Sequence, residues 1–195
     1  MEHLKCPPCK IHCTCYTIEE VVWFQNKLKY LEEMMNLHKL FTMQLALDQY
    51  IQSNKQVTED VFAKKGLALI VELAELANET RCFKFWSEKG PSERSVILEE
   101  YVDSIHFILS LGIEKGFEDL EEWPHKSIDG DLTALFIGTN ESVLTFLNEP
   151  TQNHYEKLWI MYGAIADKLG FSSEDVLQAY IEKNQTNYDR QKSGY

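Results

Sequence analysis

Apolar residues recur at helical spacing along most of the chain. Thr17 and Glu20 have the spacing of a capping box before an apolar run that reaches Met35. Later helical runs are expected at 37–51, 58–80, 95–116, 132–147, 154–169 and from Ser172 toward Tyr188. Glycine, proline and asparagine separate these runs. Because no convincing period-two runs of β-branched residues occur, the pattern predicts an all-α fold, a helical bundle.

The length and charge of the chain restrict its class. With 195 residues, we expect one all-α domain over 17–195, preceded by a Cys-rich tail over 1–16. The net charge of -12 opposes general binding to nucleic acid or to anionic membranes. No apolar stretch is long enough to span a bilayer, and no signal-peptide pattern opens the chain. We therefore expect a cytoplasmic protein.

Four of the five cysteines lie in the first 15 residues, at Cys6, Cys9, Cys13 and Cys15. Together with His12 they could form a small zinc site. The second ligand pair of a zinc module usually lies a dozen or more residues away, which favours the alternative of a flexible or reactive tail. Both interpretations remain open.

Two glutamates interrupt a very apolar helical run. Glu72 and Glu75 are three residues apart, and at 100° per residue both lie close to Leu69, Leu73 and Leu76 on the side expected to face the core. We therefore expect both carboxylates to be inside. A buried carboxylate needs a partner or a metal ion, and the middle of this helix offers no Lys or Arg.

The next helical run repeats this pattern with Glu100 and Asp103. The turn at Gly90 and Pro91 would place the two helices antiparallel and gather four carboxylates. Four hard oxygen ligands suit Mg²⁺, or Mn²⁺, completed by phosphate oxygens of a substrate. The plainer alternative is two solvated acidic helix faces. A rival of another class is an acidic helical binding protein without catalysis.

These motifs carry a resemblance to a known family. Glu72-x-x-Glu75 followed by Glu100-x-x-Asp103 resembles the metal motif of the all-α nucleoside triphosphate pyrophosphatases. Residues 78–87 are similar to the dimeric dUTPase branch, and the resemblance runs from about Leu37 to the C-terminus. It implies a homodimer that hydrolyses dUTP to dUMP with Mg²⁺, with dUDP as a further candidate substrate and Glu72 accepting a proton from the attacking water. The nearest alternative is the same chemistry on dCTP or on several nucleotides.

The same resemblance implies which residues bind the nucleotide. Gln44 and Asp48 are one helical turn apart and would read the uracil edge, because an amide both donates and accepts hydrogen bonds. The alternative is an exposed polar helix face. After the first carboxylate helix, Phe85 or Trp86 would stack on the base, and Lys84 and Lys89 would reach phosphate oxygens. Core packing is the alternative for the other aromatics of this segment.

The end of the chain is similar to a segment that closes on sugar and phosphates in the dimeric dUTPases. The residues that match are Lys183, Asn187, Arg190 and Tyr195. The first three are spaced to share one helix face. We expect this segment to be mobile until substrate binds. His106 is the remaining weak candidate, since a helical histidine is more often a packing residue than a catalyst.

Overall fold

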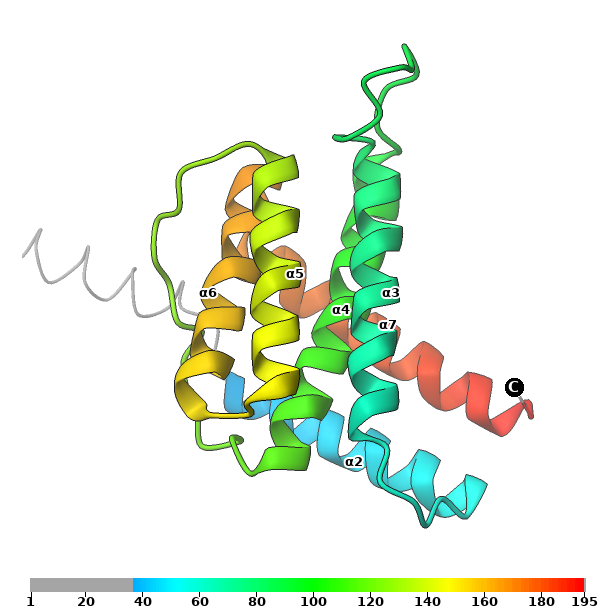
Figure 1. Cartoon of the computed structure of the whole chain (residues 1–195). Coiled ribbons are helices and arrows are strands. Elements are labelled where there is room, and N and C mark those ends of the chain that lie inside the picture. The colour runs from blue at the N-terminus through cyan, green and yellow to red at the C-terminus, as the bar shows by residue number, and fades with distance from the viewer. Residues whose placement is uncertain (1–36, 195) are drawn as a thin grey trace, which may run out of the picture. The chain divides into compact units, whose positions relative to one another are not determined.

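The structure is a computed structural model that describes residues 37–194 (Figure 1). Within that range the chain forms helices and no strands, which confirms the expected all-α fold. The helices are α2 (Leu37–Lys55), α3 (Phe62–Thr80), α4 (Arg94–Lys115), α5 (Leu132–Asn148), α6 (Gln152–Leu169) and α7 (Ser173–Lys192). None of these is long and apolar enough to cross a membrane. The cysteine cluster, the run that begins at Thr17, and Tyr195 lie outside the described residues.

The helices are arranged around α4. Figure 1 shows α3 and α4 as an antiparallel pair joined by the loop at the top, with α5 and α6 as a second pair. Helices α2 and α7 run obliquely to this bundle, and both contact α4 and each other. In the core, Tyr101 of α4 and Tyr162 of α6 stack at 4.4 Å between ring centroids. Each hydroxyl donates to the other residue's backbone carbonyl, which fixes α6 against α4.

Most helix ends follow the sequence signals. Gly116 and Gly170 end α4 and α6 in the left-handed conformation, and Ser172 begins α7 with a complete capping box. Three boundaries differ from expectation by more than two residues. Helix α2 continues past Ile51 to Lys55. Thr58 does not cap α3, which begins at Phe62, where the Asp60 carboxylate accepts from the backbone amide at 2.8 Å. Helix α7 continues past Tyr188 to Lys192.

Candidate active site

Three carboxylates converge between the middles of α3 and α4. Glu72, Glu100 and Asp103 each place one oxygen so that all three lie within 4.8 Å of one another. All three side chains are half-buried, which agrees with the apolar surroundings in the sequence. We call them the carboxylate trio. Glu75 is exposed, so the expectation that both glutamates of α3 are inside is wrong for this residue. Three residues rotate a helix by 300°, and this places Glu75 at the solvent edge of α3.

The carboxylate trio has the electrostatics of a cation site. Burial, followed by repulsion from Asp103, Glu75 and Glu100, raises the pKa of Glu72 to about 7. Burial is also the largest cause that raises the pKa of Glu100 and of Asp103. The positive charge of nearby side chains thus does not fully offset the negative charge of the three carboxylates. Hard oxygen donors in this arrangement fit Mg²⁺ or Mn²⁺.

The positive charge nearest the trio comes from α7. Lys183 Nζ lies 2.6 Å from Asp103 Oδ2 and 2.8 Å from Glu99 Oε1, and its side chain is buried. Burial opposes the charge of Lys183, but the bonds to both carboxylates outweigh burial and raise its pKa. From sequence we expected Lys183 to contact phosphate. In the described structure it holds one member of the trio.

A pocket of about 410 Å³ opens beside Glu72 and Asp103, between α2, α3, α4 and α7. Leu47, Ile51 and Val57 form part of its apolar wall. The sequence-predicted residues that line it are Gln44, Asp48, Glu72, Asp103, Lys183, Asn187 and Arg190. The fold therefore brings base-reading candidates, acidic residues and C-terminal candidates together around one space.

The loop after α3 does not line this pocket. Phe85 is 93% exposed and Trp86 is 65% exposed, with their rings 5.0 Å apart. Neither ring is therefore packed in the core. The Lys84 ammonium donates to the Asn78 side chain, and Lys89 is exposed. A role of these four residues in substrate binding stays a prediction.

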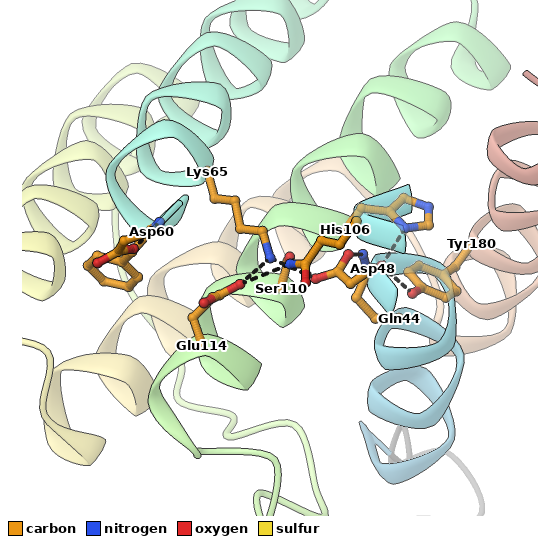
Figure 2. A network of polar contacts seen from close by, with 10 residues as sticks. Gln44, Asp48, Asp60, Lys65, His106, Ser110, Glu114 and Tyr180 are labelled. Atoms are coloured by element: carbon orange, nitrogen blue, oxygen red, sulfur yellow. Dashed lines mark hydrogen bonds and ion pairs between the residues drawn. The ribbon is translucent and has the colours of Figure 1, made fainter. Parts of the chain in front are cut away.

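Gln44 and Asp48 are buried at 3% and 9% exposure, which excludes the exposed polar face (Figure 2). Gln44 Nε2 donates to Asp48 Oδ1 at 2.7 Å. Gln44 Oε1 lies 2.7 Å from His106 Nδ1 and accepts from the Tyr180 hydroxyl at 2.8 Å. The His106 ring stacks on Tyr180, and burial, followed by the charge of Lys183, lowers the pKa of His106 to about 3. His106 is therefore neutral and part of the pocket wall.

Three further residues, which the sequence analysis missed, complete this network on the far side of Asp48 (Figure 2). Lys65 Nζ lies 2.9 Å from Asp48 Oδ2 and 2.6 Å from Glu114 Oε1, and Ser110 also donates to Asp48 Oδ2. Spacing could have indicated Lys65, because it precedes Glu72 by seven residues and so shares its helix face. Likewise, Ser110 and Glu114 follow His106 at intervals of four residues.

Comparison with known proteins agrees with this geometry. A family model described as dUTPase matches residues 36–195. A search among curated proteins finds no match. The matched range contains the carboxylate trio, the pocket and all six helices of the described part. The chain therefore belongs to the dimeric all-α dUTPase family of nucleotide pyrophosphohydrolases.

Proposed function

We propose that this protein hydrolyses dUTP to dUMP and pyrophosphate with Mg²⁺ as cofactor. The observation that supports the proposal most is that Gln44 lines the same pocket as Glu72 and Asp103. A hydrogen-bonding side chain and a cation-binding cluster at one pocket suit a ligand with a base at one end and phosphates at the other. Mn²⁺ is expected to substitute for Mg²⁺ because it prefers the same ligands.

The chain's own residues suggest a division of labour. Glu72, Glu100 and Asp103 would hold Mg²⁺, with Glu75 as a further candidate. When bound, the ion supplies charge neutralisation at the phosphates and lowers the pKa of an attacking water. Glu72 would accept a proton from that water. The oxygen of the water would join one of the two products as the bridge between the α and β phosphates breaks. Lys183, Asn187 and Arg190 would then bind sugar and phosphate.

A substrate panel tests this function. Release of pyrophosphate is measured from dUTP, dCTP and dTTP, with dUDP assayed for phosphate, each with Mg²⁺, with Mn²⁺ and with excess chelator. We expect the highest kcat/KM for dUTP and no turnover with chelator. Equal or faster dCTP hydrolysis would favour the alternative of a broader pyrophosphohydrolase. No turnover of any nucleotide would favour an acidic binding protein.

We also propose a homodimer and a cytoplasmic location. Helices α3 and α5 pack against each other, yet each exposes large apolar side chains, Leu67 and Val71 on α3 and Ile137 and Leu144 on α5. Large apolar side chains that stay exposed on two packed helices favour an interface with another chain. A second copy of the chain is the occupant that fits a dimeric family. The location remains a prediction from the sequence.

A further inference from the structure

We propose that Lys65 is a positioning residue for base recognition, which acts through Asp48 to fix the orientation of the Gln44 side-chain amide. The inference rests on the proposed function, because it concerns how the same pocket selects its base. It assigns Asp48 an indirect role, in contrast to the direct reading of uracil that the family resemblance implied. All the contacts involved are drawn in Figure 2.

The contacts of Asp48 determine which atom of the Gln44 amide faces it. Its Oδ2 accepts from the Lys65 ammonium at 2.9 Å and from the Ser110 hydroxyl, and the side chains of Lys65 and Asp48 are only 14% and 11% exposed. The Lys65 ammonium has only donors, so Asp48 Oδ2 is the acceptor of this salt bridge. A carboxylate in a salt bridge only accepts hydrogen bonds. The Gln44 atom that faces Asp48 must therefore be the amide nitrogen, as the 2.7 Å contact has it.

The two ends of the Gln44 amide have opposite hydrogen-bonding roles. Since Gln44 Nε2 faces Asp48, Gln44 Oε1 faces His106 Nδ1 and the Tyr180 hydroxyl, and both of these must donate. His106 is then neutral with its proton on Nδ1, and His106 Nε2 is buried without a hydrogen-bond partner. Both Gln44 oxygen lone pairs are occupied. The group that Gln44 has left for a ligand is its second N–H.

The orientation of the Gln44 amide determines which base it can bind. An N–H donor matches a carbonyl such as O4 of uracil, whereas the amino group at the same position of cytosine is itself a donor. An inverted Gln44 would offer its carbonyl and reverse this preference. A charged network that prevents inversion therefore contributes to selectivity without any contact between Lys65 and the base.

Replacement of Lys65 by methionine should release this control. Lys65→Met keeps an unbranched side chain but removes the ammonium that binds Asp48 Oδ2. The Asp48 side chain is then no longer held as an acceptor by a salt bridge, so that both orientations of the Gln44 amide become possible. Lys64→Met is the matched control, because Lys64 is the exposed neighbour and pairs with Glu59 instead. Lys65→Arg retains the charge and should retain the selectivity.

The decisive measurement is the ratio of kcat/KM for dUTP to that for dCTP. We expect Lys65→Met to lower this ratio roughly 5- to 100-fold, the range for an unpaired buried hydrogen-bonding group, and Lys64→Met to leave it unchanged. In a Gln44→Ala background, Lys65→Met should cause no further loss, because its effect passes through Gln44. A loss of equal size in that background would mean that Lys65 contacts the substrate itself, and would overturn the proposal.

A second measurement needs no turnover. The ¹⁵N NMR shifts of the His106 ring report which nitrogen carries the proton. We expect Nδ1 in the wild type and a shift of the proton toward Nε2 in Lys65→Met, or in Asp48→Asn if the lysine variant does not fold. A wild type without dUTP preference would refute the proposed function, yet this readout would still decide the role of Lys65. An unchanged tautomer in the folded variants would overturn the inference.

Discussion

Asp103 belongs to the carboxylate trio and also accepts the bond from Lys183, whereas Glu75 is exposed and outside the trio. This difference predicts unequal effects of two isosteric substitutions. Asp103→Asn removes charge where three oxygens meet, so Mn²⁺ affinity and turnover should both fall by orders of magnitude. Glu75→Gln should weaken Mn²⁺ binding less. Electron paramagnetic resonance titration of Mn²⁺ measures the affinities without any nucleotide.

Two outcomes would contradict this prediction. Equal losses in both variants would mean that all four carboxylates ligate the ion, as the sequence suggested. Retained Mn²⁺ binding in Asp103→Asn would mean that the trio is not the cation site. Circular dichroism of each variant checks that the helices persist.

His106 should make the fold sensitive to acid. Its pKa is lowered from 6.5 to about 3 by burial, so between these values the native state binds fewer protons than the unfolded state. Its contribution to stability is complete above about pH 6.5 and decreases as the pH falls, by up to about 1.4 kcal/mol per pH unit. The raised pKa of Glu72 acts in the opposite direction between 4.5 and about 7. The contribution of His106 is therefore measured as the difference in the pH dependence of the free energy of unfolding between the wild type and a variant without His106.

Urea unfolding between pH 4 and 7 measures that difference. The free energy of unfolding of His106→Gln should depend less steeply on pH, on the acid side, than that of the wild type. The same substitution at exposed His38 is the control. Parallel pH profiles for wild type and His106→Gln would contradict the prediction, because they would mean that His106 has the same pKa in the folded and the unfolded protein.

At the residue scale, spacing identified the acidic positions and the Gln44–Asp48 pair, because helical periodicity places residues on a face. It could not identify the partner of each charge. Lys183 reaches Asp103 from 80 residues away, and Lys65 reaches Asp48 across the α2–α3 connection. Such pairs depend on how the helices cross, for which the periodicity of one segment carries no information.

At the scale of elements, α7 extends beyond its expected end. The helix was expected toward Tyr188 and continues to Lys192, anchored by buried Val176 and Tyr180. The mobility of this segment before substrate binds stays a prediction. The capping box at Ser172 was readable from sequence. The spacing of Lys183, Asn187 and Arg190 allowed a helix face to continue at the far end of α7, but the end of the helix was not readable. Asn187 and Tyr188 are poor helix formers whose position depends on tertiary contacts, such as the one between Tyr188 and Tyr50.

Truncation after Thr186 tests the function of this helix end. It removes Asn187 and Arg190 from the pocket but leaves Lys183 and Tyr180 in place. We expect little change in Mn²⁺ affinity or in the helical signal, and a decrease in kcat/KM of about tenfold or more from lost phosphate contacts. Arg190→Lys should give a smaller decrease, because lysine keeps the charge but loses the bidentate geometry. An undiminished rate in the truncated enzyme would contradict any role of the helix end in substrate binding.

At the scale of the whole molecule, the exposed apolar side chains of α3 and α5 predict association. Leu67 and Ile137 are 63% and 57% exposed, which is unusual for such large side chains when several occur on two packed helices. Light scattering should therefore give a mass of twice the 22.7 kDa of one chain. The double variant Leu67→Lys, Ile137→Lys places buried charge in the interface and should give a monomer. Leu45→Lys, on α2, is the matched control and should remain dimeric. A monomeric wild type at micromolar concentration would refute the dimer, and a dimeric double variant would place its interface on another face.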